Sequence, residues 1–417
     1  MIPRNVQGMG PLLSNPDYRR LFGAQLVALS GTGLMTVALG LLAYDLAGAG
    51  AGALLSMVFT VKMIAYVGLS PLAQAWAVRL PRKAVLIGAD LVRAAVALCL
   101  PFVTEVWQVL ALVFVLQAAS ATFTPAYQAT LPDVLPDEAE YTRALSLSRL
   151  AYDLETLTSP ALAGLLLLVV PFSGLFAGTA LGFVLSTWLV WRSRLNAPDP
   201  DAGHRSFRDR LTRGLALYLS TPRLRGLLAL NVTAAAVGAF VLVNTVVLVR
   251  VSYGAGESAL ALAMACFGAG SMVAALGLPP LLAHRAARPV MIGAALALSA
   301  TALASAALLM RGLPPVGAGL ALMVVTGALY SAILTPGGLL IRRSAESRDR
   351  PGLFAAHFAL SHACWLVTYP LAGWLGTLLG LGPALLVMAA LGVGGVLAAL
   401  WLWPRRTKRD MDKTAWL

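Results

Sequence analysis

Long apolar runs alternate with short polar breaks along the whole chain. A helix that crosses a bilayer needs about 20 predominantly apolar residues, and twelve runs reach that length. They cover approximately residues 20–46, 52–77, 83–103, 107–129, 144–170, 172–192, 225–249, 258–282, 288–310, 314–340, 352–380 and 382–404. The pattern predicts an all-α membrane protein with 12 transmembrane helices.

The longest polar break, residues 192–223, separates two halves of nearly equal length. Short segments of the first half recur in the second half at a nearly constant separation, for example Asn15–Arg19 as Thr221–Arg225. Internal repeats of this kind indicate two copies of one structural unit. We therefore predict an N-terminal six-helix bundle over residues 1–195, a cytoplasmic linker over 196–219 and a C-terminal six-helix bundle over 220–417.

Composition places most of the protein surface in lipid. Hydrophobic residues make up 59% of the chain, charged residues only 12%, and the mean hydropathy is +0.80. A soluble domain carries roughly 25% charged residues, so this chain has too little polar surface to remain dissolved in water. Cys99, Cys266 and Cys364 lie far apart within apolar runs, which predicts neither a disulfide framework nor a CxxC metal site.

The net charge of +13 has a topological explanation. Most Lys and Arg residues fall in alternate polar breaks, together with both termini, and only Arg250 and Arg311 fall in the other set of breaks. Basic residues concentrate on the cytoplasmic side of membrane proteins. We therefore expect a multi-pass protein of a bacterial inner (plasma) membrane, with both termini in the cytoplasm and no nucleic-acid partner.

Three motifs carry a family resemblance. The break Gln74–Lys83 keeps the basic residues of the superfamily signature G-x-L-A-D-R-x-G-R-[RK]. The segment Phe123–Tyr127, followed by Leu131–Asp133, is similar to sequences of bacterial efflux permeases. The segment Ser159–Gly164 is similar to the antiporter motif G-P-x-x-G-G. On these residues the chain resembles a permease of the major facilitator superfamily, in the branch of bacterial efflux permeases. The resemblance covers essentially the full length of the chain and implies two bundles that rock about a midplane site.

The resemblance also implies a gating loop that uses Arg79, Arg82 and Lys83. In the family an acidic residue of this loop helps to latch the two halves in the outward-open state, but Val78 stands at that position here. We therefore expect a gate that differs from the usual one.

Ionisable side chains also occur inside the apolar runs, at Lys62, Asp90, Arg93, Arg149, Asp153 and Glu155. Each costs roughly 2.5–3.5 kcal/mol at the bilayer centre, so it needs a partner or a water-filled cavity. Asp90 and Arg93 are three residues apart, and Arg149 and Asp153 are four apart, which places each pair on one helix face. We predict structural charge pairs that involve Asp90, Arg93 and Arg149.

Glu155 lies about 200° round the helix from Asp153, so the two carboxylates face different surroundings. A carboxylate that faces a cavity is the usual physical basis of proton coupling, whereas the alternative for Glu155 is a polar contact with another helix. Lys62 is expected either to neutralise Asp153 or Glu155 or to bind an anionic group of the substrate.

The run 352–380 contains His357, His362, Cys364 and Tyr369. The repeat alignment puts His362 and Cys364 at the depth of Asp153. Imidazole and thiolate bind late divalent metals, so one hypothesis is a metal site at His357, His362 and Cys364. The alternative is that these side chains only pack and form hydrogen bonds.

The sequence carries neither a phosphate-binding G-x-x-x-x-G-K-[ST] motif nor an HExxH motif. We therefore expect no enzymatic activity and no cofactor. The prediction is a monomeric secondary active transporter, specifically a proton-coupled exporter (antiporter) of a small molecule. Its substrate and proton site would be built from Lys62, Asp153, Glu155, His362 and Tyr369.

Three alternatives remain open at this point. Export of drugs would need an aromatic lining, for which Tyr66, Tyr127, Tyr330, Trp365 and Tyr369 are candidates. Export of nickel, cobalt or iron ions would need the His and Cys side chains and a carboxylate to converge. A membrane scaffold or receptor without transport would leave the intramembrane charges without a role.

Overall fold

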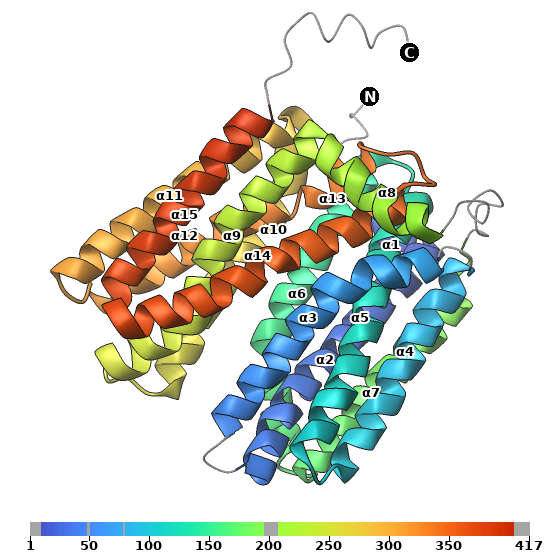
Figure 1. Ribbon diagram of the computed structural model, residues 1–417, viewed down its shortest axis with the longest axis horizontal. Coiled ribbons are helices and arrows are strands. Elements are labelled where there is room, and N and C mark those ends of the chain that lie inside the picture. The colour runs from blue at the N-terminus through green and yellow to red at the C-terminus, as the bar shows by residue number, and fades with distance from the viewer. Residues whose placement is uncertain (1–9, 48–50, 78–79, 196–206, 404–417) are drawn as a thin grey trace, which may run out of the picture.

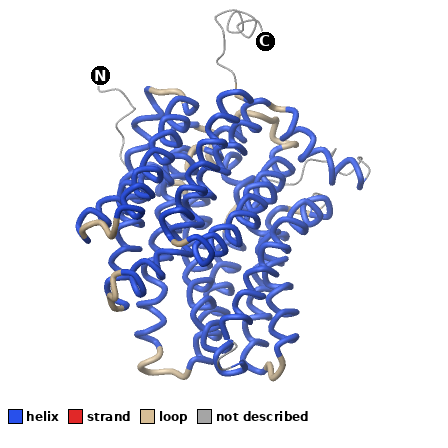
Figure 2. The backbone as a smooth tube through the Cα atoms, turned by 60° about the vertical axis from the view of Figure 1, so that its left-hand side comes forward, coloured by secondary structure: helices blue, strands red, loops and turns tan. Residues whose placement is uncertain are grey.

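The computed structural model describes residues 10–47, 51–77, 80–195 and 207–403. Over these residues the chain is almost entirely helical, and the short connections between helices account for the remainder (Figure 2). The helices of the first half are α1 (Gly10–Ser14), α2 (Pro16–Ala47), α3 (Ala51–Ala77), α4 (Arg82–Cys99), η3 (Leu100–Phe102), α5 (Val106–Val134), α6 (Glu138–Leu166) and α7 (Phe172–Arg192).

The second half begins with α8 (Phe207–Ser220), which lies within the predicted linker and packs on both α3 and α14. The helices that follow are α9 (Pro222–Val247), η5 (Leu248–Ser252), α10 (Glu257–His284), α11 (Ala287–Arg311), α12 (Val316–Leu334), α13 (Gly337–Arg342), α14 (Arg350–Leu379) and α15 (Leu381–Leu402).

Ten helices of the described residues are long and apolar enough to span a membrane. Helices α6 and α14, with 29 and 30 residues, are not among these ten. They occupy the positions of the fifth and eleventh predicted runs. Each predicted run therefore corresponds to a helical segment, and the predicted all-α membrane fold is confirmed.

The tenth predicted run, residues 314–340, is not one continuous helix. Helix α12 ends at Leu334, and α13 begins at Gly337 after a turn at Thr335 and Pro336. Proline has no N–H group to donate and clashes with the preceding helical turn, and two glycines follow Pro336 directly. The two helices together still form one candidate membrane span, Val316–Arg342, at the position of the predicted run.

The helices form two bundles that lie side by side, α2 to α7 in one and α9 to α15 in the other (Figure 1). The buried cores follow the same division: two clusters of buried apolar side chains belong almost wholly to the first bundle and one to the second. The bundles meet along two seams, α3 against α14 and α6 against α10. Side chains on these seams are therefore placed to respond when one bundle moves against the other.

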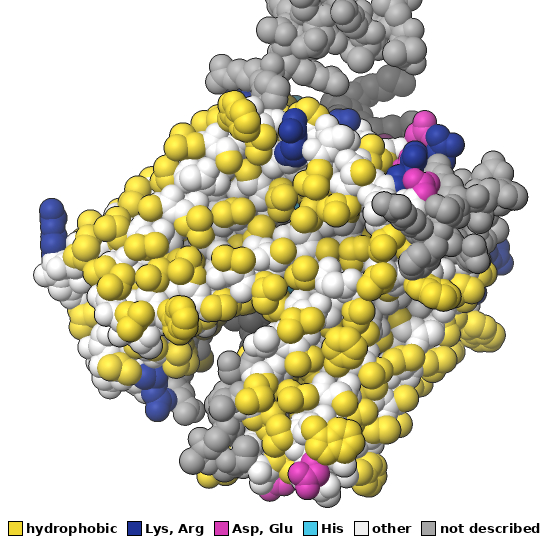
Figure 3. Space-filling model, in the orientation of Figure 1, with side chains coloured by type: hydrophobic (Ala, Val, Ile, Leu, Met, Phe, Trp, Pro, Cys, Tyr) yellow, Lys and Arg dark blue, Asp and Glu magenta, His cyan; other side chains and the backbone are white. Residues whose placement is uncertain are grey.

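The seams close one end of the molecule and leave the other end open. We call the end at which α1 begins and α15 ends the terminus end (Figure 1). Apolar side chains cover the face of both bundles in Figure 3, and a hollow separates the bundles at the opposite end. The bundles are thus closed toward the termini and apart on the other side.

Candidate functional site

Arg149 and Asp153 of α6 meet Ser271 of α10 at the seam between these two helices. Arg149 Nη2 lies 2.9 Å from Asp153 Oδ1, and the spacing of four residues puts both side chains on one face of α6. The Ser271 hydroxyl donates a hydrogen bond of 2.5 Å to Asp153 Oδ2 and accepts one of 3.1 Å from Arg149 Nε. The carboxylate of one bundle is therefore bonded directly to the other bundle.

Tyr330 of α12 completes this group of four residues, which we call the Asp153 cluster. The guanidinium carbon of Arg149 lies 5.0 Å from the centre of the Tyr330 ring, within the range of a cation–π interaction. Asp153 is buried, with 6% of its surface exposed. The charge of this buried carboxylate is balanced by the Arg149 guanidinium and stabilised by the hydrogen bond from Ser271, so removing the charge would weaken both contacts.

Aromatic side chains form the seam between α3 and α14. The ring of Tyr66 lies 4.9 Å from that of Phe358 and 4.8 Å from that of His362. One turn further along α3, Ser70 Oγ donates a hydrogen bond of 3.4 Å to the carbonyl of Ala355. His362 itself is anchored through Nδ1, 2.7 Å from the carbonyl oxygen of Phe358. This seam is mainly one of packing, in contrast to the charged seam of α6.

Lys62 and Glu155 lie on the first-bundle side of these seams. Lys62 Nζ is 5.6 Å from the centre of the Tyr66 ring and interacts electrostatically with Glu155. Ser159, one turn along α6, donates a hydrogen bond of 3.4 Å from Oγ to Glu155 Oε1. Gly33 of α2 leaves room for both side chains. The structure thus brings Lys62 to Glu155, and Asp153 to Arg149.

Asp90 and Arg93 form a buried ion pair on α4, inside the first bundle. Ser186 of α7 donates a hydrogen bond of 2.6 Å to Asp90, and the Arg93 guanidinium lies 4.3 Å and 4.4 Å from the rings of Phe123 and Phe183. The group joins α4, α5 and α7 and lies away from both seams. Its geometry serves the packing of one bundle.

The His and Cys side chains of α14 do not converge. His357 Nδ1 lies 2.9 Å from the hydroxyl of Tyr218 on α8, and Cys364 Sγ donates to the carbonyl of Leu360. Within the described part of the chain, no three side chains of His, Cys, Asp or Glu are grouped closely enough to hold a metal ion. The metal hypothesis for His357, His362 and Cys364 receives no support from this geometry.

The predicted aromatic lining divides into two sets. Tyr330, Trp365 and Tyr369 form a connected group in the second bundle. The centre of the Trp365 ring lies 6.3 Å from that of Tyr330 and 4.9 Å from that of Tyr369. Tyr127 lies elsewhere: it is buried in the core of the first bundle, where its hydroxyl donates to Gln25 Oε1 at 3.0 Å. Grouping Tyr127 with the other rings was wrong, because sequence spacing does not reveal which face of α5 is buried.

Two basic residues of the predicted gating loop act within the first bundle. Arg82 pairs with Asp133 and donates to the carbonyl of Ala129, and Lys83 Nζ donates to the carbonyl of Ser193 at 3.0 Å. Arg79 and Val78 lie outside the described residues. The loop thus holds α4 against the ends of α5 and α7.

A set of contacts that the sequence did not predict joins the two bundles at the terminus end. Arg350 Nη1 lies 3.4 Å from Asp133 Oδ1, and Arg343 Nε donates to Glu138 Oε2 at 2.9 Å. Arg342 donates to the carbonyl of Leu135 at 3.3 Å and lies over the ring of Tyr141 at 4.9 Å. We call these contacts the terminus latch. From the sequence alone, the same basic residues indicated only the orientation of the protein in the membrane.

The charge pairing in the latch changes the titration of Glu138. The hydrogen bond from Arg343 is the main cause that lowers the pKa of Glu138 below its usual value, and burial partly opposes it. The same hydrogen bond raises the pKa of Arg343. Both side chains therefore stay charged, and the pair stays formed, at neutral pH.

Comparison with known proteins gives the family. The model of the Major Facilitator Superfamily matches residues 21–301. Macrolide efflux protein A of Streptococcus pyogenes is 28% identical over 178 residues, which are 42% of this chain and 43% of that protein. The protein of the same name from Enterococcus faecalis is 32% identical over 114 residues, 26% of this chain and 35% of that protein. The matches span less than half of these relatives.

Solved structures share the fold over nearly the whole chain. A human organic anion transporter superposes with a TM-score of 0.77 at 13% identity, covering 92% of this chain and 99% of the other. A bacterial homologue of the iron transporter ferroportin, in an outward-facing state, gives 0.73 at 14% identity, with 92% and 98% covered. The Escherichia coli fucose:proton symporter gives 0.71 at 15% identity, with 93% and 98% covered.

At these low sequence identities, the similarity to solved structures establishes only the fold. The family model covers more than half of the sequence, and the helices of the described residues form two bundles. The chain is thus a multi-pass membrane protein that belongs to the major facilitator superfamily of transporters.

Proposed function

We propose that this protein is a proton-coupled exporter of a small organic molecule, an antiporter that works by alternating access. It would act as a monomer in the bacterial plasma membrane with both termini in the cytoplasm, as the distribution of basic residues favours. The observation that carries the proposal is the hydrogen bond between Ser271 and Asp153, which connects a carboxylate of one bundle to the other bundle.

Protonation of Asp153 would weaken the seam between α6 and α10. A hydrogen bond to a carboxylate is roughly twice as strong as a neutral one, so the contact from Ser271 weakens when the charge is lost. Arg149 then loses its counter-ion and is left as a buried charge, which favours its exposure to water. Proton binding thus changes the relative stability of the closed and open seam, which is the thermodynamic requirement for coupling.

The arrangement of the bundles corresponds to an outward-open state if the termini are cytoplasmic. The terminus latch then closes the cytoplasmic side, while the hollow at the opposite end admits protons and releases substrate. The rocking units would be residues 1–195 and 220–417, joined by the segment that contains α8. The latch uses Asp133 and Glu138 with Arg350 and Arg343, which supplies inter-bundle charges although Val78 replaces the acid of the signature loop.

The substrate that the geometry supports best is a bulky, largely apolar organic molecule. Tyr330, Trp365 and Tyr369 present connected rings in the second bundle next to the Asp153 cluster, since Tyr330 belongs to both groups. The relatives named macrolide efflux proteins favour the same class of substrate and the outward direction. Lys62 and Glu155 would add a polar contact for the substrate.

Growth of an efflux-deficient bacterial host tests this function. Cells that express the wild-type chain are compared with Asp153→Asn and with Asp45→Asn, which changes an exposed carboxylate at the end of α2. The panel contains macrolides, other organic drugs, and nickel, cobalt and iron salts. We expect protection against at least one organic compound that is lost in Asp153→Asn and kept in Asp45→Asn. Protection against metals alone, or equal protection by Asp153→Asn, would contradict the proposal.

A further inference from the structure

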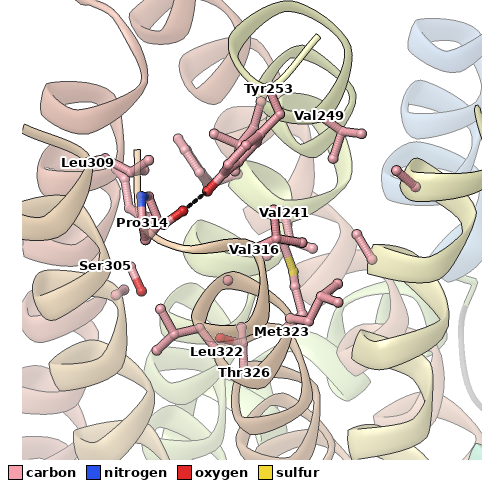
Figure 4. Close-up of a pocket in the computed structure, with 18 of the residues that line it drawn as sticks. Val241, Val249, Tyr253, Ser305, Leu309, Pro314, Val316, Leu322, Met323 and Thr326 are labelled. Atoms are coloured by element: carbon pink, nitrogen blue, oxygen red, sulfur yellow. Dashed lines mark hydrogen bonds between the residues drawn. The ribbon is translucent and has the colours of Figure 1, made fainter. Parts of the chain in front are cut away.

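A cavity lies inside the second bundle, away from both seams. It has a volume of about 140 Å³ and lies among α9, α10, α11 and α12, toward the end opposite the termini. Its walls include Val241 and Val249 on one side, Ser305 and Leu309 on another, and Met323 and Thr326 (Figure 4). None of these residues belongs to the Asp153 cluster or to the aromatic group beside it.

Helices α10 and α12, which both line the cavity, approach each other very closely at Gly270 and Gly327. A Cβ atom added to Gly270 would overlap the carbonyl of Val324, and one added to Gly327 would overlap that of Phe267. Small residues allow such close approach of membrane helices. Cavity-lining residues of both helices, such as Ala263 and Gly319, precede these glycines and their contacts in sequence.

A hydrogen bond between the connection after η5 and the connection before α12 closes one end of the cavity. The Tyr253 hydroxyl, just beyond η5, donates to the carbonyl of Pro314 at 2.6 Å (Figure 4). This contact satisfies the hydroxyl and leaves mainly apolar side chains and backbone to face the space. A water molecule in a cavity needs two to four polar partners, so this cavity does not suit water.

The size of the cavity restricts its occupant. An apolar cavity of about 150 Å³ binds a benzene-sized molecule, whereas pockets for drug-sized ligands have about 300–1,000 Å³. The cavity therefore fits a short hydrocarbon segment and is too small for a bulky substrate of the transporter. An empty apolar space also leaves its lining without dispersion contacts on one side, which favours occupancy.

The surroundings of the cavity identify the source of that hydrocarbon. Val316, one of the lining residues and the first residue of the membrane-spanning segment Val316–Arg342, is 61% exposed. In a membrane protein such apolar side chains face lipid chains. We propose that the cavity holds a segment of an acyl chain from a membrane phospholipid, as a site distinct from the transport pathway.

Photolabelling of the full-length protein tests this site. The protein is reconstituted in phosphatidylcholine vesicles that contain a phosphatidylcholine with a diazirine in one acyl chain, irradiated, digested and mapped by mass spectrometry. Gly319→Leu fills the cavity, since a Cβ there meets only the Tyr253 hydroxyl at 3.9 Å. Gly317→Leu is the matched control on the same helix, with no atom within 4 Å of its Cβ and no part in the lining.

We expect label on lining residues such as Val241 and Met323, loss of that label in Gly319→Leu, and its retention in Gly317→Leu. Label on the lining that persists in Gly319→Leu, or that is absent from the wild type, would overturn the proposal. Loss of the label in the presence of excess macrolide would assign the cavity to a transported molecule instead. If Gly319→Leu does not elute as a folded monodisperse protein, a second pair of variants on α10 replaces the first pair. Ala263→Leu then fills the cavity, and Ala261→Leu, at an exposed position outside the lining, is its control.

Discussion

Ser271 and Asp153 are 118 positions apart in sequence, yet the serine hydroxyl donates a hydrogen bond of 2.5 Å to the carboxylate. The bond joins α6 of the first bundle to α10 of the second. A carboxylate in this position senses both protonation and the separation of the bundles. The mechanism proposed for this transporter follows from that double role.

The terminus latch predicts how easily the terminus end opens. Side chains of Arg343 and Glu138 are 42% and 45% exposed, so their pair is worth only about 0–1 kcal/mol. Glu138→Gln should therefore shift the balance toward the opened terminus end by at most about fivefold. The readout is the rate at which maleimide labels a cysteine introduced at Ser70, which is buried in the α3–α14 seam.

The control for this latch is a charge reversal. Glu138→Arg combined with Arg343→Glu should return the labelling rate toward that of the parent protein, because the pair forms again with opposite polarity. A double variant that labels as fast as Glu138→Gln would show that the pair does not hold the bundles together.

The latch also predicts a pH dependence. Because Arg343 lowers the pKa of Glu138, the pair contributes fully above the usual glutamate pKa and is lost as the pH falls through the lowered value. The labelling rate of the cysteine at Ser70 in Glu138→Gln is divided by that in the parent at each pH, which cancels the titration of the thiol itself. This ratio should stay constant from neutral pH down to the ordinary titration range of glutamate and fall toward one below it. A ratio that keeps its neutral-pH value at low pH would show that the Glu138 pair is not the group that titrates.

The crossing of α10 and α12 predicts a strong effect at one glycine. Gly270→Leu forces the two backbones apart, and overpacking of this kind costs typically about 1–3 kcal/mol. Gly277→Leu on the same helix has open space around its Cβ and should have little effect. Unfolding temperature in detergent compares the two variants. Equal unfolding temperatures would contradict the close crossing.

The Asp90 and Arg93 pair predicts a loss of stability without a specific loss of coupling. Arg93→Gln leaves the Asp90 carboxylate buried without its cation, which costs roughly 3–5 kcal/mol. The double variant Asp90→Asn and Arg93→Gln removes both charges and should unfold at a higher temperature than Arg93→Gln alone. A double variant that is less stable than either single variant would refute the pairing.

Much of the fold could be predicted because lipid imposes a simple rule on sequence. Helices must satisfy their own backbone in the bilayer, so apolar runs of sufficient length mark them directly. Local spacing also indicated that Asp90 meets Arg93 and that Arg149 meets Asp153. The turn at Pro336 was missed, since other prolines, such as Pro125, lie within helices of this protein.

Contacts between the bundles could not be predicted in this way. Ser271 is an ordinary polar residue in sequence, and its partner, Asp153, lies 118 positions away in the other bundle. The basic residues of the terminus latch were already explained by membrane orientation, so nothing in the sequence indicated that they also form contacts between the bundles. Helical periodicity gives the face on which a residue lies but not which helix covers that face, so Tyr127 was assigned to the wrong surroundings.

The most direct test of the central claim uses purified protein in proteoliposomes with a pH gradient and a macrolide or other compound identified in the growth assay. Asp153→Asn keeps the size of the side chain but cannot lose a proton. We expect it to abolish uptake driven by the gradient while exchange of labelled for unlabelled substrate continues, and Glu155→Gln to retain gradient-driven uptake. Gradient-driven uptake by Asp153→Asn at the parental rate would contradict the account.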